Sequence, residues 1–181
     1  MKKTWILFVS AIAGAAACQR PAAPTLAPAP TPAQTSAAAM LDVMDTRVPV
    51  PLLPMMANHQ KQNMRDQLQA VQAIVGAVGA ADFDAIARAA ATIGYSEQMG
   101  RMCSHMGAGA PGFTEQALRF HHTADKISAA ARDRDMPGVL GALGDTLATC
   151  TGCHATFKQK LVDATTWASL AGQAAPQPQH R

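Results

Sequence analysis

Five consecutive residues near the C-terminus, Cys150 to His154, read CTGCH. On a helix, the two cysteines at i and i+3 share one face, and His154 follows at i+4 from Cys150. Two thiols with this spacing can form thioethers with the two vinyl groups of a haem, and the imidazole can then coordinate the iron. The pentad therefore predicts one covalently bound haem c, an iron protoporphyrin, attached through Cys150 and Cys153 with His154 as the proximal ligand.

Three other chemistries use the same residue types: a structural disulfide, a dithiol redox pair, and half of a zinc site. A redox C-x-x-C pair is expected beside a strand–helix unit, which the sequence does not predict here. A zinc site would need a further ligand such as Cys103 to arrive with the right geometry. The sequence favours haem over all three.

The residues that must position this pentad lie in a long stretch that is poor in proline. Between Met55 and Gln173 only Pro111 and Pro137 occur, and such a stretch favours helices. The first predicted helix runs from about residue 55 to 78 and ends at Gly79. Its apolar stripe is expected to consist of Met64, Leu68, Val71, Val75 and Val78.

Three further segments have the same helical pattern. Asp82 can cap a helix that begins at Phe83 and that Gly94 breaks or kinks. Thr114 can cap a third helix ending near Asp133, after the glycine-rich loop 107–113. Asp135 can cap a fourth helix that continues to about Lys160. The inward stripe of this fourth helix is expected to include Val139, Leu143, Leu147, Cys150, His154 and Phe157. The fold class expected is all-α: an antiparallel four-helix bundle with haem near the C-terminal helix.

The N-terminal third has a different composition. Residues 1–18 combine two lysines with a short apolar run, which predicts a signal peptide. Small residues lead into Cys18, which resembles a bacterial lipobox and predicts lipidation; ordinary cleavage after an A-x-A site is the alternative. Residues 19–54 are rich in Ala and Pro and predict an extended tether. The bundle is expected over 55–162 and a frayed tail over 163–181, where Trp167 and Leu170 could hold part of the tail in place.

The pentad near the end of the last of four Ala-rich helices, continued as CTGCHATFK, resembles the class II c-type cytochromes, namely the cytochrome c prime and cytochrome c-556 types. The resemblance covers roughly residues 55–160 and implies a haem held among four helices. Phe157 and Lys158 match residues that follow the pentad in that family, with Lys in place of the commoner Arg. The resemblance also makes a homodimer possible, since dimers are common among these relatives.

The resemblance further implies that the residue opposite His154 comes from the first helix. Met64 is the nearest match, and Met55, Met56 and His59 are alternatives if the helix begins elsewhere. Ligation by Met and His suits an electron carrier. A vacant distal position would instead give a five-coordinate, cytochrome c prime-like protein that binds nitric oxide or carbon monoxide.

Other groups of residues have simpler interpretations. Met99, Met102, Cys103, His105 and Met106 could bind copper(I), but their spacing is that of a buried helical stripe, and burial is the simplest role for Cys103. His121 and His122 point about 100° apart on a helix, so at most one faces inward. Surface roles are the commoner outcome for such residues, with contact to a haem propionate as the functional alternative.

Charge excludes one class of partner. The net charge of +3 falls to +1 without Lys2 and Lys3, so the mature chain has no electrostatic footprint for nucleic acid.

Taken together, these patterns predict a non-enzymatic electron carrier of the bacterial periplasm, anchored to a membrane surface through lipidated Cys18. Its expected partners are redox proteins of the periplasm or inner membrane.

Overall fold

A computed structural model describes residues 32–172 of the chain. The predicted signal peptide with Cys18, the first part of the tether (19–31) and the end of the tail (173–181) lie outside the described residues. Helix α1, Pro32–Met44, forms a unit separate from the one that begins at Asp45. This segment was expected to be extended, but its Ala-rich sequence favours a helix, and proline is compatible with a first helical turn. No helix within 32–172 is both long and apolar enough to cross a membrane.

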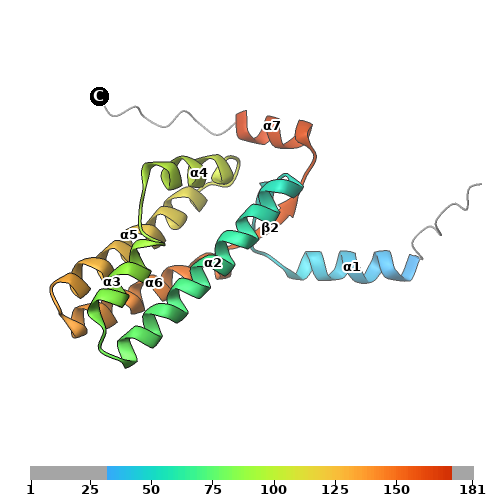
Figure 1. Ribbon diagram of the computed structural model, residues 1–181. Helices are drawn as coiled ribbons and strands as arrows, with labels where there is room; N and C mark the ends of the chain where they lie inside the picture. Colours follow the sequence, from blue (N-terminus) through green and yellow to red (C-terminus); the bar gives the residue numbers. More distant parts are fainter. Residues whose placement is uncertain (1–31, 173–181) are drawn as a thin grey trace, which may run out of the picture. The chain divides into compact units, whose positions relative to one another are not determined.

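The unit that begins at Asp45 is mostly helical (Figure 1). Its helices are α2 Pro54–Gly79, α3 Phe83–Ala91, α4 Glu97–Gly107, α5 Phe113–Arg132, α6 Met136–Thr156 and α7 Ala164–Gly172. The first predicted helix is therefore confirmed to within a residue at each end. The break expected at Gly94 separates α3 from α4.

Side-chain caps fix the starts of several helices. Asp82 accepts a hydrogen bond from the Ala85 N–H at 2.9 Å, and Asp135 accepts one from the Gly138 N–H at 3.0 Å. Both predicted caps are confirmed. The Thr114 cap is wrong: α5 starts at Phe113, two residues earlier than that cap would place it, and its N-cap is Gly112, whose φ of 81° lies in the left-handed region that suits glycine. The Thr114 hydroxyl instead donates to the Cys103 carbonyl at 3.4 Å.

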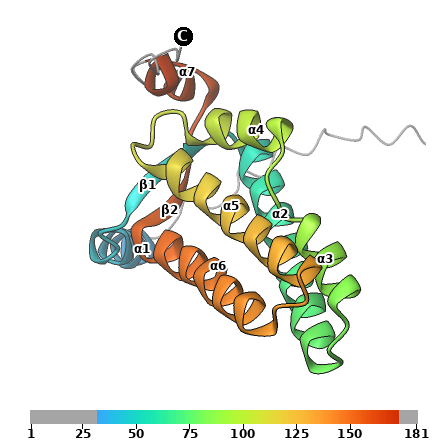
Figure 2. The same ribbon diagram turned by 90° about the vertical axis from the view of Figure 1, so that its left-hand side faces the viewer.

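Two short strands were not predicted. Strand β1, Val48–Leu52, pairs in parallel with β2, Phe157–Leu161, and Val48 lies opposite Phe157 (Figure 2). The helix expected to reach Lys160 therefore ends at Thr156, and residues 48–52 belong to the folded unit, not to a tether. Burial explains the difference, because Val50 and Leu52 are 1% and 0% exposed and lie in a hydrophobic cluster.

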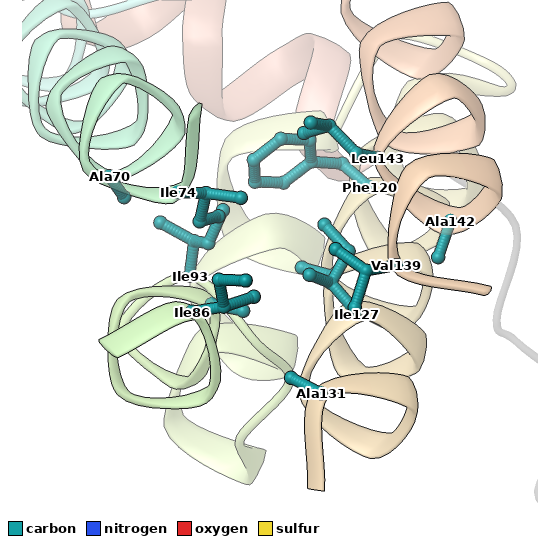
Figure 3. Close-up of a cluster of buried hydrophobic side chains, with 12 residues drawn as sticks. Ala70, Ile74, Ile86, Ile93, Phe120, Ile127, Ala131, Val139, Ala142 and Leu143 are labelled. Carbon is teal, nitrogen blue, oxygen red and sulfur yellow. The ribbon is translucent and has the colours of Figure 1, made fainter. Parts of the chain in front are cut away.

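The main core lies between four helices. Helix α5 packs against α6 on one side and α3 on the other, and α3 also packs against α2 (Figure 2). Buried side chains from all four meet in one cluster, in which Ile74, Ile86 and Phe120 point into the space between the helices (Figure 3). This core holds α5 and α6 together over the part of α6 that precedes the pentad.

The buried face of α2 differs from the predicted stripe. Ile74 is 0% exposed, whereas Leu68 and Val75 are 69% and 54% exposed. Adjacent helical residues point about 100° apart, so the helix is rotated such that Ala70 and Ile74 face the core. Met64, Val71 and Val78 lie at the edge of that face, half-buried. Leu147 on α6 is likewise 42% exposed instead of inward.

Candidate functional site

The pentad occupies the last turns of α6. Cys150 and Cys153 are half-buried free thiols, and the His154 side chain is exposed. The helix is fixed just before the pentad, because the Gln116 amide on α5 donates to the Thr149 carbonyl at 3.2 Å. The Cys150 thiol donates to the Thr146 carbonyl at 3.5 Å, within the same helix. The pentad is therefore displayed from a helix that is bonded to its neighbour.

A cavity opens beside the pentad. The cavity is partly open, and the empty space in it and at its mouth, open solvent included, amounts to about 700 Å³. Helix α6 contributes Thr149, Cys150, Cys153 and His154 to its wall, and α2, α4 and α5 supply the rest. The side chains opposite the pentad are largely apolar, sulfur-containing or uncharged.

Met64 lies in the wall of this same cavity, half-buried on α2. The structure therefore brings together Cys150, Cys153, His154 and Met64, the four residues that the sequence singled out. The alternatives to Met64 lie elsewhere: Met55 is 77% exposed, Met56 packs in the cluster around Val50, and the exposed His59 ring is 3.3 Å from the Asn63 amide. None of these three is part of the cavity wall.

Burial controls the protonation of the pentad thiols. Burial raises the pKa of Cys150 above its ordinary value. Burial also raises the pKa of Cys153, and repulsion from the Cys150 thiolate, when that group ionises, raises it further. Both side chains are therefore neutral thiols at pH 7, and neither is the low-pKa thiolate expected of a redox-active pair.

The sulfur-containing stripe of α4 also faces the cavity. Met99, Met102, Cys103 and Met106 all contribute to its wall, and burial raises the pKa of the Cys103 thiol. His105 lies apart from them, with its ring 5.1 Å from the Trp167 ring of α7. Within residues 32–172, no three side chains among His, Cys, Asp and Glu are grouped closely enough to hold a metal ion by themselves. The stripe is thus part of the wall opposite the pentad.

His121 is a cavity residue, whereas a surface role was the commoner expectation for both histidines. Its side chain is 3% exposed, lines the cavity, and has Nδ1 2.8 Å from the Ile93 carbonyl oxygen. Because a carbonyl only accepts hydrogen bonds, Nδ1 must carry the proton, and Nε2 keeps a lone pair when the ring is neutral. Burial lowers the pKa of His121, which favours that neutral form. His122 is exposed and stacks on Tyr95 with ring centroids 4.7 Å apart, so only one of the two histidines faces inward, as the sequence predicted.

Two glutamines in this region gave no clear signal in the sequence. Gln60 on α2 is 6% exposed, lines the cavity, and accepts a hydrogen bond from the Gln159 amide on β2. The bond joins the start of α2 to the strand that follows the pentad. The sequence did not predict this hydrogen bond, because the residues of β2 were expected to continue the helix that carries the pentad.

The donor set can be compared with the requirements of a covalently bound haem. Such a group needs two thiols one turn apart, an adjacent imidazole, and an apolar cavity next to them. Cys150, Cys153 and His154 supply the thiols and the imidazole, and the walls of α2, α4 and α5 supply the cavity. The residues present fit haem c, and the Met64 thioether adds a soft donor on another helix.

Comparison with known proteins agrees with this class of site. Over 51 residues the chain is 39% identical to "Cytochrome c'" of Rubrivivax gelatinosus, a match that covers 28% of this chain and 40% of that protein. No protein-family model matches the chain. No solved structure matches it either. The partial match supports a relationship to the c-type cytochromes.

Proposed function

We propose that this chain is a monohaem c-type cytochrome that carries electrons in the bacterial periplasm. The observation that carries the proposal is the convergence of Cys150, Cys153, His154 and Met64 on one cavity, from two different helices. The partial identity to a cytochrome c' supports the same class. In this proposal α2, the α3–α4 pair, α5 and α6 form an antiparallel four-helix bundle of the class II type.

Each of these residues has a distinct role in the proposal. The Cys150 and Cys153 thiols form the thioether attachments, and His154 is the proximal ligand. Met64 is the distal ligand, and a Met/His pair raises the reduction potential of the iron that it holds. When bound, the haem accepts and releases one electron. The side chains of α4 and α5 form a largely apolar wall against which the haem would lie.

In this proposal the N-terminal segment determines where in the cell the carrier is located. The leader of residues 1–18 directs export, and lipidated Cys18 anchors the mature protein to a membrane surface. Its partners are redox proteins of the periplasm or the inner membrane, and the protein itself is not an enzyme. Mass spectrometry of the mature chain would detect the acyl chains and the haem together.

One spectrum separates this proposal from its main alternative. The reduced protein, matured with c-type haem, is recorded before and after carbon monoxide is added. Sharp, split bands that carbon monoxide leaves unchanged are expected for a six-coordinate iron. Broad high-spin bands that shift would contradict ligation by Met64 and favour a five-coordinate protein that binds nitric oxide or carbon monoxide.

A further inference from the structure

The end of α6 carries an unusual contact with a distant segment of the chain. The last carbonyl groups of a helix have no partners within it, and His154 lies in that last turn. Arg47 reaches this turn from the residues just before β1. Its Nη1 atom donates to the His154 carbonyl oxygen at 3.1 Å and to the Phe157 carbonyl oxygen at 3.4 Å. The proposed proximal ligand is thus held through its own backbone.

Asp45 holds the guanidinium of Arg47 in this orientation. Its two carboxylate oxygens accept from Nε at 2.9 Å and from Nη2 at 2.8 Å, a bidentate pair, and Oδ1 also accepts from the Arg47 backbone N–H at 3.2 Å. The Arg47 guanidinium lowers the pKa of Asp45 to about 2. The pair therefore stays charged throughout the neutral pH range.

Two further contacts fix this segment to the strand after the pentad. Lys158 Nζ donates to the Asp45 carbonyl oxygen at 2.7 Å, and its ammonium lies 3.8 Å from the Asp45 carboxylate. The parallel register then sets Val48 opposite Phe157. The guanidinium is bound on one side by Asp45 and on the other by the carbonyl groups of His154 and Phe157. The orientation of its planar, forked set of N–H donors is therefore fixed.

We propose that Arg47 is a positioning residue for His154. It binds the backbone carbonyl of His154, and Asp45 in turn orients Arg47, so that the imidazole is presented to the haem iron in one orientation. This inference rests on the proposed function, because it assigns Arg47 a role toward the haem. It also connects the segment before β1 to the end of the helix that carries the pentad.

The test compares R47Q and D45N with the wild type, using the full chain with its haem attached. R101Q is the control, because Arg101 is exposed, pairs with Glu97 at 3.7 Å on α4, and is not part of the cavity wall. Positioning predicts that R47Q and D45N both broaden the electron paramagnetic resonance signal of the ferric iron, because His154 samples several orientations. R101Q leaves the width unchanged, and R47K, which keeps the charge but loses the fork, broadens it less than R47Q.

The reduction potential separates positioning from simple electrostatics. Loss of the Arg47 charge lowers the potential and loss of the Asp45 charge raises it, so charge alone gives opposite shifts without broadening. Opposite shifts of the reduction potential without broadening of the resonance signal would overturn the proposal. Signal widths of R47Q and D45N equal to that of R101Q would overturn it as well. If R47Q does not fold, D45N provides the same comparison, because it keeps Arg47 and removes only its partner. A wild-type chain without covalent haem would refute the proposed function instead, so the two failures are distinguishable.

Discussion

Two neighbouring residues of α2 provide a sharp test of the fold. Ile74 is 0% exposed in the core between the helices, whereas Val75 is 54% exposed. Replacing Ile74 by Ala removes three buried carbon atoms, a transfer cost of about 2.4 kcal/mol. The cavity left behind adds to this cost, so a total loss of about 3–4 kcal/mol is expected, within the range for such changes.

Val75→Ala is the matched control, one position further along the same helix. An exposed substitution is expected to change stability by no more than about 0.5 kcal/mol, and the higher helix propensity of Ala favours the variant. Urea titration of the holoprotein at pH 7, followed by far-ultraviolet circular dichroism, gives both values, provided that the denaturant slope is unchanged. A Val75→Ala loss equal to or greater than that of Ile74→Ala would refute the rotation of α2 and restore the stripe that the sequence predicted.

Three further predictions concern the site. Met64→Ala is expected to convert the iron to a high-spin state that binds carbon monoxide, as a visible spectrum will show; an unchanged spectrum would move the distal ligand to another residue. Cys150→Ser or Cys153→Ser is expected to reduce the haem that stays with the denatured chain, and full retention would refute the attachment. Because burial lowers the pKa of folded His121, the unfolded state binds more protons near its ordinary pKa of 6.5. The free energy of unfolding should therefore fall as the pH drops from 7 to 5. His121→Gln should weaken this dependence and His122→Gln should preserve it; equal effects in urea titrations would contradict the burial argument.

The helices were predictable because local signals determine them. Asp82 and Asp135 each accept a hydrogen bond from a backbone N–H three residues later, and this preference depends only on nearby residues. Proline-free stretches and glycine breaks set the remaining limits. The pentad was predictable for the same reason, since its chemistry depends on spacing along one helix.

The orientation of each helix depends on its neighbours, and there the sequence was less informative. On α2 the valines and leucine suggested one stripe, but Ala70 and Ile74 face the core. Small residues allow close approach between helices without contributing a strong hydrophobic signal. Helix α4 is a case in which the stripe was predicted correctly, because Cys103 and Met106 are both buried.

The strands depend on pairing between segments more than a hundred residues apart, and no local pattern reveals such pairing. Prolines in β1 favoured a tether, and the residues of β2 continued the helical stripe of α6. Yet Phe157 leaves the helix and packs edge-on against Phe113, with ring centroids 5.4 Å apart. The alternation of buried and exposed positions is weak in β2, so only its partner strand defines it.

The chemistry of the site and the precision of the site therefore come from different parts of the sequence. Cys150, Cys153 and His154 are encoded within five residues, so the types and spacing of the reactive groups are a local property. Their placement relies on Gln116 from α5 and on Arg47 from the residues before β1, which bond the backbone at either end of the pentad. Because backbone groups accept these bonds, neither bond involves a side chain of the pentad. A helix end held at both sides in this way can present an imidazole in one orientation, as the proposed role of His154 as an iron ligand requires.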